Sequence, residues 1–110
     1  MGCVLPAGLG QAPARQASLG ANIPTSAGCT TINKLCGSGM KAIMLAHDII
    51  KAGSANVVVA GGMESMTNAP HLLNGSRNGI RYGSAEFIDH RAYDGLTDPY
   101  QGKAMGVFGD

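Results

Sequence analysis

The sequence predicts an α/β protein, and three successive stretches carry that prediction. Residues 30–33 form a short β-branched run, residues 38–52 have the periodicity of a long helix, and residues 55–62 are a continuous apolar run with three consecutive valines. A short apolar run that ends in glycines is typical of a strand covered on both faces. A strand, a helix and a second strand in this order predict a β-α-β unit with parallel strands and a right-handed crossover.

Local signals along the chain justify each element. A helix is expected from Pro13 to near Gly20, because proline suits the first helical position and glycine the end. A turn-rich connector then leads to the β-branched run at 30–33. The helix at 38–52 contains no proline, and apolar residues cover most of its surface, so we expect it to be largely buried. Gly53 is placed to end it.

The chain beyond Gly62 has a different character. It is rich in Gly, Asn, Asp and Pro and has only short apolar clusters, which predicts a long excursion of loops. Long loops in compact proteins are often functional. A two-strand unit would leave sheet edges and a helix face uncovered, so neither end of the chain resembles a domain boundary. We therefore expect the sequence to be an internal piece of a longer protein.

Composition and charge argue against several classes of function. The 110 residues have a formal charge of +1 with scattered basic residues, which indicates neither a nucleic acid nor an anionic membrane as partner. No apolar run approaches the roughly 18 residues of a membrane span, and no signal peptide is evident. The three cysteines are spaced for neither a disulfide framework nor a metal site. A reducing, cytoplasmic setting is expected.

Cys36 is the strongest candidate for chemistry. It lies at the expected carboxyl end of the 30–33 strand and just before the long helix, where ligands bind in open α/β sheets. Unpaired N–H groups and the helix dipole favour an anion there, and therefore the nucleophilic thiolate. Gly37 and Gly39 disfavour a helix, a cost that is offset if a substrate carbonyl approaches the backbone and the Cys36 N–H donates to its developing oxyanion.

Structural interpretations of the same residues stand beside this one. A single cysteine is often a small buried apolar residue, and glycines at a helix start can simply allow a helix to pack tightly on a strand. For Cys29, in or near the expected strand, the structural interpretation is preferred. Cys3 has no sequence context that argues for reactivity.

A cysteine nucleophile normally needs a base, usually histidine. His47 lies eleven residues beyond Cys36, about 16 Å along a helix, and cannot serve. His71 and His90 lie in the loop region. Their spacing favours a place in a functional site no more than it favours exposure on the surface. Glu64 follows the valine run, where it could act chemically or hold a loop by hydrogen bonds, and the second interpretation is preferred. The G-x-S-x-G pattern of a serine hydrolase is absent from the cysteine segment.

Four blocks of the sequence resemble the thiolase family in order and spacing, and most closely its acetyl-CoA acetyltransferases. They are "VLPAGLGQAPARQ", "TTINKLCGSGMKA", "VVVAGGMESMTNAPHLL", and "DGLTDPY" followed by "AMG". The likeness extends over essentially the whole chain. It implies a partial thiolase-like α/β fold, in which residues 1–65 belong to the N-terminal domain that carries the nucleophile. Residues 66–110 would then belong to the loop region of CoA binding and tetramer assembly.

The resemblance also implies a reaction. Cys36 would attack the thioester of acetyl-CoA and carry the acetyl group, and a second acetyl-CoA would condense with it to acetoacetyl-CoA, with thiolysis as the reverse. Leu96 matches a residue that lies against the pantetheine of CoA, and Met105 one that lines the acyl pocket. The stretch from Met66 to Asp89 resembles a part used in tetramer assembly. CoA thioesters are then the substrates, no resident cofactor or metal is implied, and a homodimer or homotetramer is expected.

The sequence departs from the family pattern in two respects. Ala104 stands where many acetoacetyl-CoA thiolases have histidine, which leaves the acyl-chain preference open. The blocks that would supply the activating histidine, a water-holding asparagine and a second cysteine are missing, so this chain alone is expected to be inactive. Two alternatives remain open. One is a β-ketoacyl synthase-like condensing enzyme that takes acyl groups from a carrier protein, and the other is a non-catalytic thiolase-like chain with a role in assembly.

Overall fold

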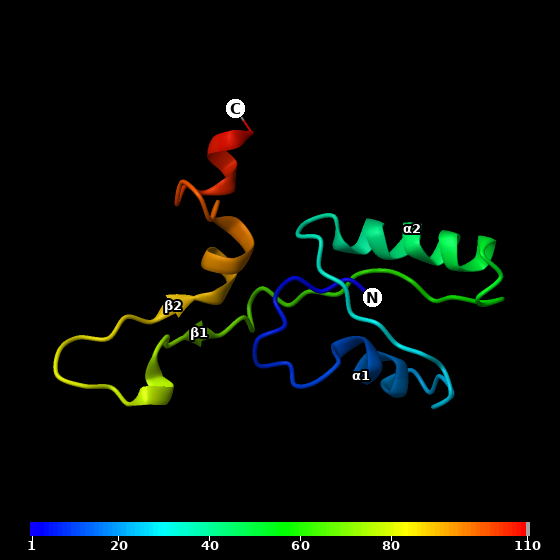
Figure 1. Cartoon of the computed structure of the whole chain (residues 1–110), viewed down its shortest axis with the longest axis horizontal. Helices are drawn as coiled ribbons and strands as arrows, with labels where there is room; N and C mark the ends of the chain where they lie inside the picture. The colour runs from blue at the N-terminus through cyan, green and yellow to red at the C-terminus, as the bar shows by residue number, and fades with distance from the viewer. Residues whose placement is uncertain (110) are drawn as a thin grey trace. The chain divides into compact units, whose positions relative to one another are not determined.

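The computed structural model describes residues 1–109, and the chain divides into two units (Figure 1). The first unit is Met1–Glu64 and the second begins at Ser65. Each is described here by itself. No helix of the described residues is long and apolar enough to cross a membrane.

Three extended segments run parallel in the first unit. Gly2 forms a parallel bridge with Ile32 and another with Gly62. The Gly2 N–H donates to the Gly61 carbonyl at 2.8 Å, and the Ile32 N–H donates to the Met1 carbonyl at 3.0 Å. The β-branched run and the end of the valine run are therefore parallel, as predicted, although each forms an isolated bridge rather than the predicted strand. The N-terminal residues lie between them, and no sequence pattern had pointed to that central segment.

Two helices complete the first unit at the predicted positions. Helix α1 spans Pro13–Gly20 and begins with its proline. Helix α2 spans Ser38–Lys51. Gly53 follows it with a φ of 71°, the left-handed conformation in which glycine ends a helix without steric cost. Both helix predictions are confirmed to within one residue.

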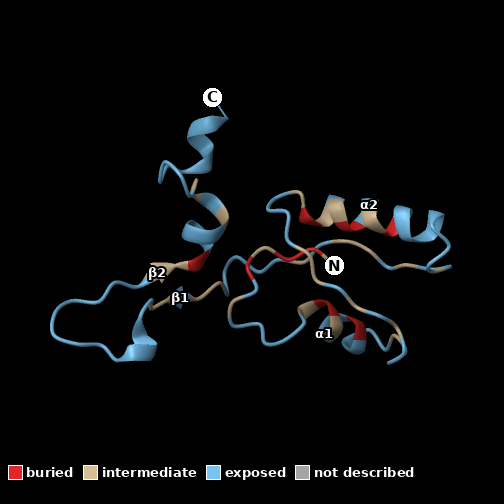
Figure 2. Cartoon of the chain, viewed as in Figure 1, coloured by how far each residue is buried: buried red, intermediate tan, exposed pale blue. Residues whose placement is uncertain are grey.

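Helix α2 lies directly on the extended segments through small residues. Its buried residues are Ser38, Ala42 and Ala46, which share one face at a spacing of four (Figure 2). A Cβ atom on Gly2 would lie 2.5 Å from the carbonyl carbon of Ser38. A Cβ atom on Gly39 would lie 3.3 Å from the Gly62 nitrogen. Only glycine at these positions allows so close an approach of helix and extended backbone.

The predicted extent of burial is wrong for two elements. Helix α2 leaves its larger apolar side chains exposed, with Met40 at 71% and Ile43 at 58%. The valine run is extended but forms no strand ladder in residues 1–109, and Val57 is 84% exposed. The physical reason is the same for both, because a strand needs hydrogen-bonded neighbours and a helix face needs an opposing layer. Only the short N-terminal segment and the stripe of small residues supply such contacts.

The second unit consists of short elements joined by long loops, as the composition beyond Gly62 predicts. Strand β1, His71–Leu72, pairs antiparallel with strand β2, Ile88–Asp89. Three short helical segments accompany the strands: η1 Ser76–Asn78, η2 Arg91–Leu96 and η3 Met105–Phe108. The middle segment, η2, has the wide turn of a π-helix, a form that is frequent at functional sites.

Candidate functional site

Cys36 lies at the amino end of α2, separated from the first helical residue by Gly37. Its side chain is exposed. A hollow of about 270 Å³ opens beside it and draws on the N-terminal segment, the start of α2 and the stretch after the valines. The residues that line the hollow are Gly2, Val4, Leu35, Cys36, Ser38, Gly39, Gly62, Met63 and Glu64. Cys36 therefore lines a space formed where the extended segments meet the helix, at the end of the β-branched run where the sequence placed it.

A network of hydrogen bonds shapes the turn that presents Cys36; we call residues 33–38 the cysteine turn. The Asn33 Oδ1 atom accepts the Leu35 N–H at 2.9 Å. The Ser38 Oγ atom accepts the Lys34 N–H at 2.8 Å and donates to the Leu35 carbonyl at 2.6 Å. Ser38 is buried, so its hydroxyl is held in this role. Sequence reasoning missed Asn33 and Ser38, although a side-chain amide that opens a turn is a recognisable signal.

The residue before Cys36 has a strained backbone. Leu35 has a φ of 47°, in the left-handed region, where a residue with a Cβ costs about 1–2 kcal/mol. Its N–H and its carbonyl are both held, by Asn33 and Ser38 respectively. The cysteine turn thus holds Leu35 in a conformation that leucine rarely adopts, and this fixes the direction in which Cys36 leaves the extended segment.

The backbone N–H of Cys36 is a hydrogen-bond donor that the described residues do not use. Within residues 1–109 its N–H donates to no other residue, and its thiol forms no hydrogen bond. A thiol and an unused N–H on one residue can attack a carbonyl carbon and bind the resulting oxyanion. The described residues contain no group of three side chains that could hold a metal ion.

The two glycines after Cys36 have different explanations. The packing of α2 accounts for Gly39, because a Cβ atom there would press on the Gly62 backbone. Gly37 has a φ of −88°. A Cβ atom on it would meet only the Lys34 carbonyl at 3.4 Å, an ordinary contact. The structural interpretation of glycine therefore holds at Gly39, while nearby packing does not require Gly37.

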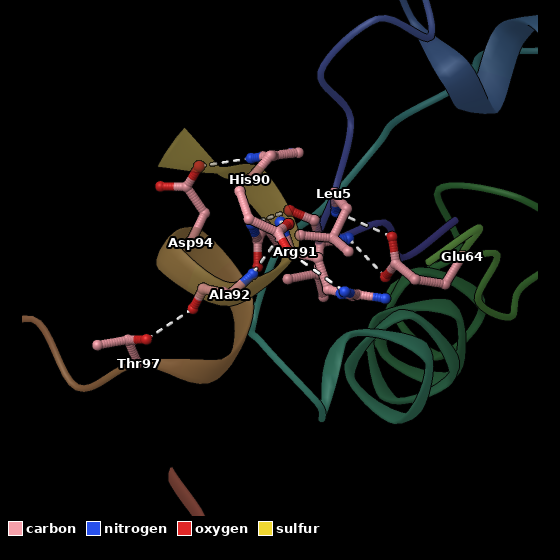
Figure 3. A network of polar contacts seen from close by, with 10 residues as sticks. Leu5, Glu64, His90, Arg91, Ala92, Asp94 and Thr97 are labelled. Atoms are coloured by element: carbon pink, nitrogen blue, oxygen red, sulfur yellow. Dashed lines mark hydrogen bonds and ion pairs between the residues drawn. The ribbon is translucent and has the colours of Figure 1, made fainter. Parts of the chain in front are cut away.

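Glu64 holds a loop, which was the preferred interpretation. Its two carboxylate oxygens accept the backbone N–H groups of Val4 and Leu5 at 2.9 Å and 2.8 Å (Figure 3). The Cys3 thiol lies 3.7 Å from the same carboxylate. Burial, and then the negative charge of Glu64, raise the pKa of that thiol. Cys3 is thus a buried, unreactive cysteine of the kind that packs rather than reacts.

Cys29 is partly exposed and lies beside a cation. The Arg15 Nη1 atom is 3.8 Å from its sulfur, and the guanidinium also donates to the carbonyls of Ala27 and Thr25. The pKa of the Cys29 thiol is lowered by the nearby Ser18 hydroxyl and by Arg15. Because the buried Ser18 hydroxyl has no hydrogen-bond partner of good geometry, we assign the effect mainly to Arg15. Cys29 therefore lies where the sequence favoured a structural role. Its thiolate form, however, is favoured more than the sequence suggested.

The three histidines have different environments. His47 is exposed on α2 and lies 3.1 Å from Asp48, as expected for a solvated face. His71 is exposed in β1. His90 is buried, and its Nδ1 atom lies 2.5 Å from the Asp94 carboxylate (Figure 3). His90 is therefore not a surface residue, which its spacing had left open.

Leu96 and Met105 lie at matching positions in the second unit. Leu96 ends η2 and Met105 begins η3, and the pair Thr97 and Ala104 between them forms an antiparallel bridge. Because Thr97 and Ala104 are paired, their neighbours Leu96 and Met105 lie at the same end of the short loop between them. Both of these side chains are about half exposed. Their roles toward CoA remain predictions from the family resemblance.

Comparison with known proteins identifies the family. The chain matches the family model described as the thiolase N-terminal domain over residues 1–110. It is 55% identical over 107 residues to a probable acetyl-CoA acetyltransferase of Mycolicibacterium smegmatis, a match that covers 97% of this chain and 28% of the relative. It is 54% identical over 107 residues to an acetyl-CoA acetyltransferase of Cupriavidus necator, covering 97% of this chain and 27% of that relative.

A solved structure agrees with these relatives. The Acat5 thiolase from Ascaris suum, determined in complex with coenzyme A, superimposes with a TM-score of 0.91 at 45% identity. The superposition covers 96% of this chain and 27% of the solved chain. The present chain thus spans little more than a quarter of the length of the relatives it matches. Over that quarter, both its sequence and its fold place it in the thiolase family.

Proposed function

We propose that the complete protein is an acetyl-CoA C-acetyltransferase and that Cys36 is its nucleophile. The observation that carries this proposal is an exposed thiol held at the start of α2 by the strained cysteine turn, beside a hollow and next to its own unused N–H. The names of the relatives support acetyl-CoA as the substrate.

The first half-reaction is the transfer of an acetyl group to sulfur. The Cys36 thiolate attacks the thioester carbonyl of acetyl-CoA, and the carbonyl oxygen becomes an oxyanion that accepts the Cys36 N–H. The bond between carbon and the CoA sulfur then breaks, CoA leaves and takes up a proton, and an acetyl thioester remains on Cys36.

The second half-reaction forms a carbon–carbon bond. A base removes a proton from the methyl carbon of a second acetyl-CoA, and that carbon attacks the acetyl group on Cys36. The carbon–sulfur bond to Cys36 breaks, which restores the thiolate and releases acetoacetyl-CoA. No histidine forms a hydrogen bond with the Cys36 thiol in residues 1–109. We therefore propose that the base and the residue that activates the thiol lie outside this chain, and that the chain alone is inactive.

The acylating substrate separates this proposal from the two alternatives. A β-ketoacyl synthase-like enzyme would acylate Cys36 from a carrier protein and not from acetyl-CoA. A non-catalytic chain would acylate from neither. We also propose that CoA thioesters react without a metal or a resident cofactor, so that a chelator leaves the rate unchanged. The cytoplasmic location and the homodimer or homotetramer remain predictions.

The test is thiolysis of acetoacetyl-CoA by the complete protein and by two single variants. Cys36→Ala should abolish turnover, and Cys29→Ala, which removes the other partly exposed thiol, should retain it. Turnover by Cys36→Ala at the rate of the unaltered protein would refute the proposal. Acylation by an acyl carrier protein alone would favour the synthase-like alternative instead.

A further inference from the structure

His90 is the only buried residue of the described part of the second unit, residues 65–109. It is 5% exposed, in a unit whose apolar side chains all remain at least partly exposed. An imidazole is an unusual choice for such a position, because a buried polar side chain costs free energy unless it is hydrogen-bonded. The position therefore calls for a reason beyond packing.

One partner of the His90 side chain lies one turn further along η2. The His90 Nδ1 atom meets the Asp94 Oδ2 atom at a spacing of four residues, and Asp94 is the exposed member of the pair. A carboxylate has only acceptors, so Nδ1 carries the proton and donates. A hydrogen bond of a ring N–H to a carboxylate is among the stronger kinds. The hydrogen bond between His90 and Asp94 therefore stabilises the amino end of η2 over one wide turn.

The rest of η2 is fixed at its two ends. At the start, the Asp89 Oδ1 atom accepts the Arg91 N–H at 2.9 Å, and the His90 N–H donates to the Pro70 carbonyl at 3.1 Å. At the end, the Thr97 hydroxyl donates to the Ala92 carbonyl at 2.8 Å (Figure 3). These contacts leave Leu96, the last residue of η2, with a half-exposed side chain on a well-defined segment.

We propose that His90 and Asp94 are positioning residues that hold η2, so that Leu96, which the family resemblance matches to a residue against the pantetheine of CoA, meets that arm of the substrate. This inference rests on the proposed function, because it assigns the pair to recognition of the substrate's arm rather than to the acyl-transfer step. It predicts a selective effect. Loss of the pair should impair a substrate with a pantetheine arm and spare one without most of that arm.

The experiment compares two thioesters in the complete protein. Acetyl-CoA carries the whole arm, and the acetyl thioester of N-acetylcysteamine carries only its last part. For His90→Leu, kcat/KM for acetyl-CoA should fall about tenfold, mainly through KM, as expected for the loss of one charge-assisted hydrogen bond. The value for the truncated thioester should change less than about twofold. Leu96→Ala should reproduce the same selective loss.

Two conservative variants sharpen the test. The amide nitrogen of His90→Asn can occupy the place of Nδ1 and should restore part of the loss, whereas His90→Gln places its amide nearer to Nε2 and should not. If His90→Leu does not fold, the exposed partner provides the same test, because Asp94→Ala should show the same selectivity.

Each outcome of this experiment either supports or overturns the positioning role of His90 and Asp94. A selective loss for acetyl-CoA that Asn rescues supports the positioning role. Equal losses for both thioesters, or no loss for either, in a protein that is otherwise active would overturn this inference and leave the proposed function standing. An unaltered protein that turns over neither thioester would overturn both.

Discussion

Removal of the Ser38 hydroxyl is the most informative change to the cysteine turn. In Ser38→Ala, the Lys34 N–H loses its acceptor at 2.8 Å. The Leu35 carbonyl loses the hydroxyl donor at 2.6 Å but keeps the backbone N–H of residue 38 at 2.9 Å. A hydrogen bond of this kind contributes about 1 kcal/mol net, so the loss of both amounts to about 2 kcal/mol. Relaxation of Leu35 from its left-handed conformation returns part of its strain of about 1–2 kcal/mol. We therefore expect the free energy of unfolding to fall by about 1–2 kcal/mol.

The assay is urea unfolding of the chain followed by circular dichroism, with Ser54→Ala as the matched control. Ser54 is exposed beyond the end of α2, and its hydroxyl forms no hydrogen bond in the part of the chain that the structure describes. The control should change the free energy of unfolding by less than about 0.5 kcal/mol. If Ser38→Ala is as stable as Ser54→Ala, the cysteine turn is not held by this hydroxyl and the reasoning is refuted. In the complete protein, Ser38→Ala should also slow the acylation of Cys36.

Three further changes test other contacts of the first unit. Gly2→Ala should lower the free energy of unfolding by more than about 2 kcal/mol, because its Cβ would meet the α2 backbone at 2.5 Å and overpack it. Glu64→Gln should lower it by about 1–2 kcal/mol, because one of the two carboxylate oxygens that accept backbone N–H groups becomes a donor. Arg15→Gln should move the alkylation of Cys29 by iodoacetamide to higher pH, because the cation that lowers the thiol pKa is gone and less thiolate is present at a given pH.

Each of these changes has a control of the same kind. Gly20→Ala adds a methyl group with nothing within 4 Å of it and should leave stability nearly unchanged. Glu86→Gln alters an exposed carboxylate of the second unit and should do the same. Cys3, whose pKa is raised by burial and by Glu64, should be alkylated only at a higher pH than Cys29. Equal pH profiles for these two cysteines would contradict the assignment of the Arg15 contact.

The elements that the sequence predicted well are those with strong local signals. The proline at the start of α1 and the glycine after α2 mark helix ends through backbone conformation alone, so no distant contact was needed to find them. The place of Cys36 before α2 followed from the order of a β-branched run and a helical pattern. The identification of the family came from four sequence blocks rather than from physical reasoning about any one of them.

What the sequence could not predict depends on contacts between distant residues. The central place of the segment around Gly2 is set by hydrogen bonds to segments about 30 and 60 residues away, and such pairings leave no local pattern. The burial of His90 and the bidentate role of Glu64 likewise depend on partners that only the fold brings near. The sequence predicted that the apolar face of α2 is buried, because hydrophobic periodicity indicates that such a face needs an opposing layer. The periodicity does not show that another element supplies this layer.

The most direct test of the proposed mechanism is to locate the acetyl group on the complete protein. The protein is mixed with acetyl-CoA, quenched in acid and digested, and the peptide that contains Cys36 is examined by mass spectrometry. We predict one acetyl group on Cys36, which free CoA removes and which is absent from Cys36→Ala. Turnover of acetyl-CoA with the acetyl group on another cysteine, or with no acetylated cysteine at all, would contradict the assignment of Cys36 as the nucleophile.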